Sequence, residues 1–183
     1  ESNDGYPKSK AADPSRWYHE GEGAFEASNP LFKKLPNANE IAWYVKKGDA
    51  HWEESTWWEV FGELHTGGMW LKKLSVIAQE NNMELADLKL KCPNGKDFRV
   101  SYSFDDYSIS PANGKPADNV ISNYFFLPAL GYYNDGKLSY LGSYGSYWSS
   151  SADPSDSSYA YNLSFYIGNV NLYDRNRLIG FVA

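Results

Sequence analysis

The sequence predicts an α+β domain, with helices in the first half of the chain and antiparallel strands, ending in a hairpin, in the C-terminal half. Two observations support this fold class. Apolar residues recur at helical spacing before Cys92, whereas apolar and polar residues alternate after it. The chain of 183 residues is long enough for one domain with its own core. Residues 1–16 are polar and aperiodic, which predicts a flexible lead-in or linker before a domain over residues 17–183.

The first half contains one ambiguous segment and two candidate helices. The apolar run at residues 41–45 is too short to distinguish a strand from the start of a helix. Asp49 or Ser55 is the expected N-cap of a helix that runs through Leu64, because apolar and aromatic residues recur there at helical spacing and two glycines follow. A shorter amphipathic helix is expected around residues 74–78, and the two asparagines that come after it end it.

Turn residues divide the second half into short strands. Residues 98–104 alternate as a strand, and residues 124–128 predict a buried strand that its last residue, a proline, ends. Residues 134–136, Asn-Asp-Gly, predict a tight turn. Alternation over residues 161–167 and a reversal at Gly168-Asn169 predict a β-hairpin with one buried face and one polar, aromatic face. The buried face is expected to contain Tyr161, Leu163, Phe165, Ile167, Val170 and Leu172.

The composition changes abruptly near the C-terminus. Residues 139–183 contain no Lys, Glu, Gln or Met, although the preceding 138 residues hold all 13 Lys and all 11 Glu. Ser (10), Tyr (7) and Asn (4) make up 21 of these 45 residues. Tyr provides large, rigid contact area at low entropic cost, and Ser and Asn provide adaptable hydrogen bonds, as in antibody paratopes. This composition favours a binding surface, although an ordinary sheet with a Ser- and Tyr-rich solvent face would also produce it.

No combination of residues in the sequence indicates catalysis or metal binding. The three histidines, His19, His51 and His65, have no metal-binding spacing with a carboxylate partner, and the single Cys92 excludes an internal disulfide and a cysteine zinc site. No nucleophile elbow, phosphate-binding glycine loop or dinucleotide-binding motif occurs. We therefore expect no enzyme activity, no metal site and no cofactor. A net charge of −6 argues against a nucleic-acid partner, and the lack of an apolar run of about 18 residues argues against a transmembrane segment.

Two stretches taken together resemble a known family. They are residues 126–132 (FLPALGY) and residues 145–151 (GSYWSSS), accompanied by Ala160-Tyr161, Leu163-Ser164-Phe165 and Gly180-Phe181-Val182. These stretches are similar to those of the major-paralogous (Fibrobacter-type) domain of Bacteroidetes surface proteins, which is related to the C-type-lectin-fold variable proteins of diversity-generating retroelements. The similarity extends from about residue 36 to the end and includes residues 39–49 and 67–70.

The resemblance implies a C-type lectin-like fold whose ligand surface is formed by the last hairpin and its loops. In retroelement-diversified members, adenines of AAC or AAT codons are randomised, which never produces Lys, Glu, Gln, Met or Trp. Apart from Trp148, these residue types are missing from residues 139–183, which we interpret as a variable-type region. Trp148 is followed by Ser149-Ser150 rather than the Asn-Asp of calcium-dependent lectins, which argues against calcium-mediated sugar binding. Formylglycine-generating enzymes share the fold but use paired cysteines, whereas this chain has only Cys92.

These observations assign a framework and a ligand surface. The framework consists of Trp43, Trp70, Phe126, Leu127, Trp148, Leu163 and Phe165. The ligand surface consists of Tyr144, Ser146, Asp153, Ser155, Asp156, Tyr159, Asn162, Tyr166, Asn169, Asn171, Tyr173, Asp174, Arg175 and Asn176. The Tyr residues are expected to anchor the contacts, and the Asp residues and Arg175 to set polar specificity.

The expected function is non-enzymatic binding of a receptor or adhesin type, with a retroelement-diversified surface. The domain would be displayed on a bacterial cell surface or carried by a phage, and its partner would be a protein or glycan on a cell surface. The alternative is a fimbrial or surface adhesion module that binds glycan without diversification. A reverse transcriptase gene and a near-identical template repeat beside the coding sequence would distinguish the first hypothesis from the second.

Overall fold

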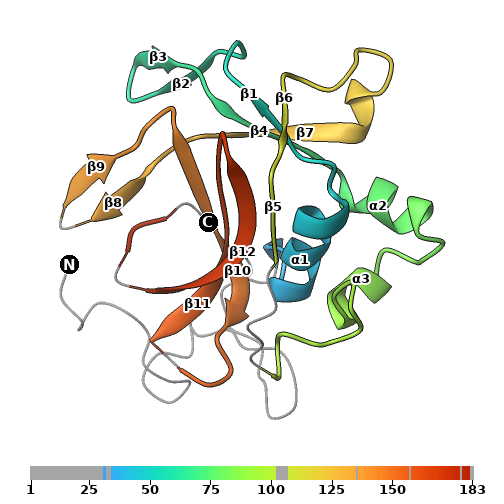
Figure 1. Cartoon of the computed structure of the whole chain (residues 1–183). Coiled ribbons are helices and arrows are strands. Elements are labelled where there is room, and N and C mark those ends of the chain that lie inside the picture. Colours follow the sequence, from blue (N-terminus) through green and yellow to red (C-terminus); the bar gives the residue numbers. More distant parts are fainter. Residues whose placement is uncertain are drawn as a thin grey trace.

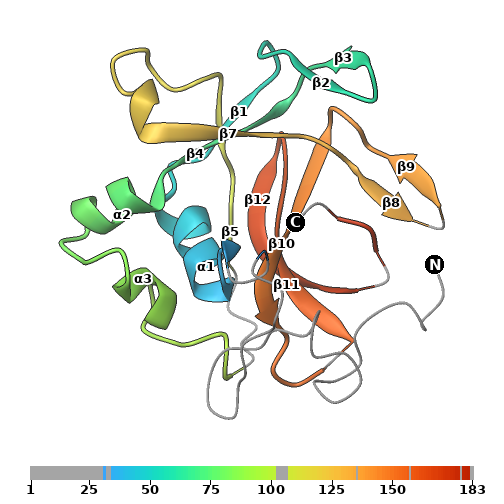
Figure 2. The ribbon, with the colours of Figure 1, turned by 180° about the vertical axis from the view of Figure 1, so that it is seen from behind.

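The computed structural model describes residues 31, 34–101, 107–134, 136–156, 158–177 and 179–181. The predicted lead-in, residues 1–16, lies outside the described residues. Within them the fold is mixed α+β, with three short α-helices and several small sheets, as the fold class predicted. The helices lie on one side of the molecule, and the hairpin of β8 (Tyr132–Asn134) and β9 (Lys137–Ser139) lies on the opposite side (Figures 1 and 2).

The ambiguous segment at residues 41–45 belongs to helix α1 (Ala38–Lys47). Asn37 is the N-cap of this helix. Its side chain accepts a hydrogen bond from the Glu40 backbone N at 3.0 Å, and the Glu40 carboxylate accepts one from the Asn37 backbone N at 2.9 Å. This capping box fixes the start of a helix whose short apolar run would also suit a strand. Most of α1 is buried, and the helix forms one wall of the core.

The helix predicted over residues 49–64 does not form. The region contains three short strands instead, β1 (His51–Glu53), β2 (Trp58–Val60) and β3 (Glu63–His65). Asp49 has a φ of +45°, a left-handed conformation that no N-cap adopts. Phe61 and Gly62 have φ values of +55° and +79°, as the two central residues of a tight hairpin turn require. Turn formation therefore overrides the helical spacing of the aromatic residues.

Ser55, the other predicted cap, belongs to a turn after β1. Its backbone N donates to the Glu53 carboxylate at 2.6 Å, its hydroxyl donates to the same oxygen, and the Thr56 backbone N donates at 2.9 Å. Burial by itself would raise the pKa of the Glu53 carboxyl, but these hydrogen bonds together outweigh burial and lower it. The ionised carboxylate thus organises the chain reversal between β1 and β2.

The next segment agrees with the sequence. Strand β4 (Gly68–Lys72) leads into helix α2 (Leu74–Glu80), which buries Ile77 and Ala78 and ends at Asn81. Helix α3 (Asp87–Leu90) follows. The strand predicted at residues 124–128 is β7 (Tyr124–Pro128), although only Tyr124 in it is fully buried. It follows a 3-10 helix, η3 (Ile121–Asn123), and it joins β6 (Ala112–Asn113), β1 and β4 in a sheet of order β6-β1-β4-β7.

Residues 98–101 form a turn rather than the beginning of the predicted strand, and residues 102–104 lie outside the described residues. The Asp97 side chain determines this turn, because its Oδ1 atom accepts hydrogen bonds from the Arg99 backbone N at 3.0 Å and from Arg99 Nε at 2.8 Å. The alternation in the sequence did not reveal this local bond.

The C-terminal sheet has the order β10-β11-β12-β5. Its strands are β10 (Tyr144–Ala152), β11 (Tyr159–Tyr166), β12 (Asn169–Asn176) and β5 (Ser108–Ile109). The predicted hairpin is confirmed as β11 and β12, but the turn residues are Ile167 and Gly168, and Asn169 already belongs to β12. Ile167 is therefore exposed rather than buried. The turn predicted around residues 134–136 connects β8 to β9.

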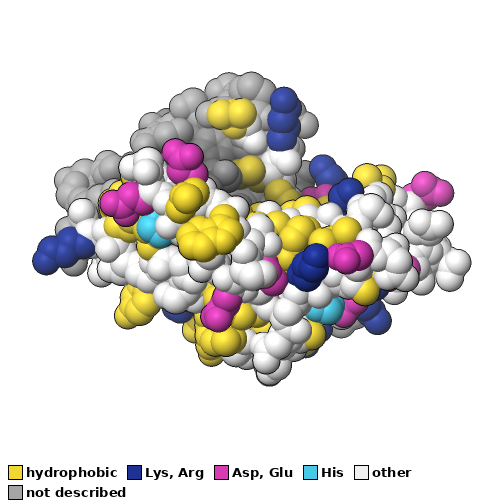
Figure 3. Space-filling view, turned by 90° about the horizontal axis from the view of Figure 1, so that it is seen from above, with side chains coloured by type: hydrophobic (Ala, Val, Ile, Leu, Met, Phe, Trp, Pro, Cys, Tyr) yellow, Lys and Arg dark blue, Asp and Glu magenta, His cyan; other side chains and the backbone are white. Residues whose placement is uncertain are grey.

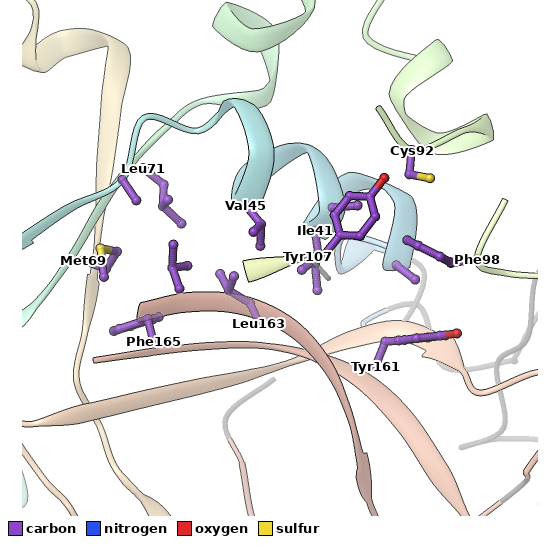
Figure 4. Close-up of a cluster of buried hydrophobic side chains, with 14 of the residues drawn as sticks. Ile41, Val45, Met69, Leu71, Cys92, Phe98, Tyr107, Tyr161, Leu163 and Phe165 are labelled. Carbon is purple, nitrogen blue, oxygen red and sulfur yellow. The ribbon is translucent and has the colours of Figure 1, made fainter. Parts of the chain in front are cut away.

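The core lies between α1 and the C-terminal sheet. Ile41 and Val45 of α1 point toward Leu163 and Phe165 of β11, with Met69 of β4 at one end of the cluster (Figure 4). Three predicted framework residues, Trp43, Leu163 and Phe165, are buried, whereas Trp70, Phe126, Leu127 and Trp148 are only partly buried. The core thus covers one face of β11 and leaves its other face for a different role.

Candidate ligand-binding face

The register of the C-terminal sheet places eight predicted ligand-surface residues on one side of it. Directly paired residues of antiparallel strands share a face. Tyr144, Ser146 and Trp148 of β10 pair with Tyr166, Ser164 and Asn162 of β11. Asn169, Asn171 and Tyr173 of β12 pair with those β11 residues in the same order, and Arg175 pairs with Ala160. We call the side opposite Leu163 and Phe165 the outer face; it carries Tyr144, Ser146, Asn162, Tyr166, Asn169, Asn171, Tyr173 and Arg175.

Two of these residues, Ser146 and Asn162, are not surface residues, so their assignment as ligand contacts was wrong. Both have an exposed fraction of 0%. Asn162 Nδ2 donates to Ser146 Oγ at 2.7 Å and to Ser164 Oγ at 2.5 Å, and the two hydroxyl oxygens lie 3.2 Å apart. The strands that carry them curve away from α1 (Figures 1 and 2). Both side chains are shielded from solvent, although the alternation predicts an outward position.

The accessible part of the outer face is aromatic, amide-rich and positively charged. Tyr166, Tyr173 and Arg175 are exposed, and Tyr144, Asn169 and Asn171 are partly exposed. Asn169 Nδ2 donates to Ser108 Oγ at 2.6 Å, but the side-chain oxygens of Asn169 and Asn171 have no hydrogen-bond partner. Both oxygens are buried, so they are internal acceptors without a partner and do not add to the accessible surface.

The other six predicted residues lie elsewhere. Asp153, Ser155 and Asp156 belong to the connection between β10 and β11, where Asp153 Oδ1 accepts from the backbone N atoms of Ser155 at 2.6 Å and Asp156 at 3.1 Å. Asp153 is 4% exposed, so it forms a turn and does not contact a ligand. The register pairs Tyr159 with Asn176, and Asp174 with the core residue Tyr161. This pairing puts Tyr159, Asp174 and Asn176 on the side of the sheet that faces the core.

A pocket of about 360 Å³ lies beside the outer face. Its walls are the rings of Tyr132, Tyr140, Tyr144 and Phe181. The Tyr132 ring stacks on Tyr140 at a centroid distance of 5.5 Å and meets Tyr144 and Phe181 edge to face at 5.6 Å and 6.0 Å. Asn134, Arg175 and Ile179 complete the lining. We call it the tyrosine pocket.

Of the predicted residues, Tyr144 and Arg175 line the tyrosine pocket. Sequence reasoning missed Tyr132, Asn134, Tyr140 and Phe181. The run Tyr-Tyr-Asn at residues 132–134 was the available signal, because it has the same residue types as the C-terminal region. It was overlooked because it precedes residue 139, where the composition changes.

Of the described lining residues, Arg175 alone is charged, and its side chain is unpaired. The guanidinium carbon of Arg175 lies 4.1 Å from the centroid of the Tyr173 ring, and Arg175 forms no hydrogen bond or ion pair with a described residue. Within that same set of lining residues there is no Asp or Glu. By contrast, Nε of the neighbouring Arg177 donates to the Tyr159 carbonyl at 3.1 Å. The pocket therefore combines flat apolar walls with a guanidinium that is free to bind an anion.

A second, apolar hollow of about 300 Å³ adjoins this pocket and shares Tyr132 and Phe181 with it. Val60 and Phe61 of the β2–β3 hairpin line its other side. Exposed apolar side chains stand beside acidic ones on the face that carries this hairpin (Figure 3). The described residues that line this hollow include no charged side chain, so they offer area for contact but no charged group.

The described part of the chain shows no arrangement of residues for binding a metal ion and no helix for crossing a membrane. No three His, Cys, Asp or Glu side chains gather there closely enough to hold a metal ion. Nor does this part contain a helix with the length and apolar character needed to cross a membrane.

Comparisons of the chain with protein-family models, with curated proteins and with solved structures each found no match. The role of the outer face and of the tyrosine pocket is therefore inferred from the residues that form them.

Proposed function

We propose that the protein is a non-enzymatic binding domain whose outer face and tyrosine pocket contact a protein or glycan ligand on a cell surface. The observation that carries this proposal is the placement of Tyr144, Tyr166, Tyr173, Asn171 and Arg175 on the side of the sheet opposite the core. Tyr and Arg dominate the energetics of known binding surfaces, and Asn adds adaptable hydrogen bonds. The same strands hold the core with their other face, so the surface rests on a rigid support.

A C-type lectin-like architecture and diversification by a retroelement belong to the same proposal. The resemblance of residues 126–132 and 145–151 supports the architecture, with which a mixed α+β fold and a C-terminal hairpin are compatible. The region without Lys, Glu, Gln and Met, residues 139–183, includes all three strands that form the outer face. Display on a bacterial surface or on a phage particle would follow from this role.

Glycan adhesion without diversification is the second candidate. The tyrosine pocket favours it, because a concave, aromatic-lined cavity of a few hundred Å³ suits one small ligand group. A surface selected only for variability has no need of such a preformed cavity. The two candidates therefore differ in whether binding depends on the pocket.

Binding to an array of cell-surface glycans and bacterial surface proteins tests the proposal. Tyr144→Ala and Tyr173→Ala should each weaken the strongest binding by about tenfold or more, the loss expected for an anchor residue. Leu85→Ala is the matched control, because Leu85 is exposed on the helical side of the molecule between α2 and α3. If both Tyr variants bind as the wild type does, with unchanged melting temperatures, the ligand surface lies elsewhere and the proposal fails.

Genomic sequence distinguishes the two candidates. A reverse transcriptase gene and a near-identical, non-coding repeat of the segment that encodes residues 139–183 are expected under diversification. If neither is present and binding still depends on Tyr144, undiversified adhesion is the correct reading.

A further inference from the structure

We propose that the tyrosine pocket binds an acidic saccharide, a sugar ring that carries a carboxylate, and that Arg175 binds the carboxylate. This inference rests on the proposed binding function and specifies its ligand. It follows from the charge of the pocket, the arrangement of its rings and the hydrogen-bonding groups between them.

The charge of the pocket selects an anion. The protein carries a net charge of −6, yet the described residues that line the tyrosine pocket include Arg175 and no Asp or Glu. The Tyr173 ring supports the guanidinium from one side and provides no counter-ion. The remaining N–H groups of Arg175 are therefore available to a ligand. A guanidinium binds a carboxylate in a planar, two-bonded geometry, which is stronger and more specific than a bond to a neutral group.

The aromatic walls select a ring rather than a bare ion. The Tyr132 and Tyr140 rings are inclined by only 25°, while the Tyr144 ring stands at 75° to Tyr132. These rings support one another, which reduces the entropy lost when a ligand orders them. Such surfaces suit the apolar face of a pyranose. A free phosphate or sulfate ion would contact Arg175 and leave these walls unused.

Hydrogen-bonding groups at the pocket favour a polyhydroxylated ligand over an aromatic acid. Three phenol hydroxyls and the Asn134 carboxamide belong to the lining, and each can donate and accept hydrogen bonds. Sugar hydroxyls match such a set, whereas a benzoate would leave it unsatisfied. The volume of about 360 Å³ lies at the lower end of the range for small-ligand sites, as expected for one or two sugar rings.

Two matched pairs of probes test the inference by isothermal titration calorimetry. Sialyllactose is compared with its methyl ester, in which the carboxylate is neutral, and digalacturonate is compared with its neutral counterpart digalactose, which separates sialate from uronate as the source of the carboxylate. At least one acidic member should bind about tenfold or more tightly than its neutral counterpart, and added salt should reduce the difference. Arg175→Gln should abolish the preference, and Arg175→Lys should retain part of it, because Lys keeps the charge but lacks the planar fork.

The folded state of each variant is checked by its melting temperature, and Leu85→Ala again provides the control. A second variant, Tyr140→Ala, should weaken acidic and neutral sugars alike, because the ring acts on the shape of the ligand and not on its charge. Equal binding of acidic and neutral sugars, or a preference that survives Arg175→Gln, would overturn the inference while leaving the pocket as a binding site. If none of the four probes binds, the acidic-saccharide inference is wrong, and the array experiment alone then decides the proposed binding function.

Discussion

A substitution at Gly145 tests whether the core-facing side of the C-terminal sheet, opposite the proposed ligand face, is fully packed. Gly145 lies on β10 and pairs with Phe165 of β11. A Cβ atom added at Gly145 would lie 2.1 Å from Cζ and 2.3 Å from Cε2 of the Phe165 ring. Carbon atoms in contact are normally about 3.5–4.0 Å apart, so the ring would have to move by more than about 1 Å. Phe165 is 0% exposed and its ring stacks on Tyr147, which leaves no space for that movement.

We expect Gly145→Ala to destabilise the protein by about 2 kcal/mol. Overpacking of a filled core typically costs about 1–3 kcal/mol, and the upper end of this range applies because the added Cβ atom would come within 2.1 Å of the Phe165 ring. The lower chain entropy of alanine offsets about 0.5–1 kcal/mol of that cost. The expected fall in melting temperature is about 4–8 °C for a domain of this size.

The measurement is urea denaturation of the wild type, Gly145→Ala, Phe165→Leu and the double variant. The double variant should be more stable than the sum of the two single effects predicts, by about 1 kcal/mol, because the smaller side chain makes space for the new methyl group. Gly168→Ala is the control: its Cβ atom would lie 3.0 Å from the end of the exposed Tyr166 ring, which can move, so stability should change by less than about 0.5 kcal/mol. Additive effects of the two core substitutions would refute the packing argument.

Three further predictions concern the scaffold. Asn39→Ala should lower the free energy of unfolding, measured by urea denaturation, by about 3 kcal/mol. The buried Asn39 side chain donates to the Lys89 carbonyl and to Asp97 Oδ1 and accepts from the Phe98 backbone N, which would lose its partner. Exposed Asn119→Ala is the control, and equal stability of the two variants would contradict this reasoning. Phe61→Asn should raise the stability by about 0.5–1 kcal/mol in a thermal melt, because Phe61 is 74% exposed and has the positive φ that Asn tolerates. A loss of stability would show that contacts of the Phe61 ring stabilise the fold. Burial by itself would raise the pKa of the Asp97 carboxyl, but hydrogen bonds from Arg99 and Asn39 outweigh burial and lower this pKa. Ionised Asp97 therefore stabilises the fold at any pH above its unfolded pKa of about 3.9. This stabilisation is lost as the pH falls through the lower pKa of the folded state. Melting temperatures from about pH 6 to about pH 2 should therefore fall more steeply for the wild type than for Asp97→Asn, and equal slopes would refute this assignment.

The parts of the fold that the sequence predicted depend on local signals. Helix α2, strand β7 and the two hairpin reversals follow from helical spacing, from a terminal proline and from Gly-containing turns. The error over residues 49–64 arose where two local signals conflict. Aromatic residues recur there at helical spacing, but Asp49 and Phe61 have positive φ, and the Glu53 carboxylate holds a turn between strands. The positive φ of Phe61 is not predictable from residue type, because Phe rarely adopts this conformation.

Only part of the candidate site was predicted, because alternation within a strand is a local signal whereas the exposure of a residue is not. Alternation along β12 placed Asn169, Asn171, Tyr173 and Arg175 on one face, because period 2 is a property of a single strand, but the prediction also put Asp174 and Asn176 there, which the register places on the core side. Whether a position on that face is exposed depends on the tertiary structure, which buries Ser146 and Asn162. The tyrosine pocket escaped prediction because its walls come from β8, from the residues around the start of β10 and from Phe181, which only the tertiary structure brings together.

The buried hydrogen-bond network sets a limit on how this face can vary. Asn162 lies in the region that we propose to be variable and is a residue type that randomised AAC or AAT codons would encode, yet it bonds Ser146 and Ser164 in the sheet. Replacing it would remove both hydrogen bonds that its Nδ2 atom donates, which typically costs about 0.5–1.5 kcal/mol each, and would leave the two hydroxyl groups with only each other as partners. Substitution at exposed Tyr166 or Tyr173 removes no such bond and should change stability by less than about 0.5 kcal/mol. Variation compatible with folding is therefore confined to the accessible rim of the outer face, where the proposed ligand contacts lie, while the centre of the same face has to keep its residues.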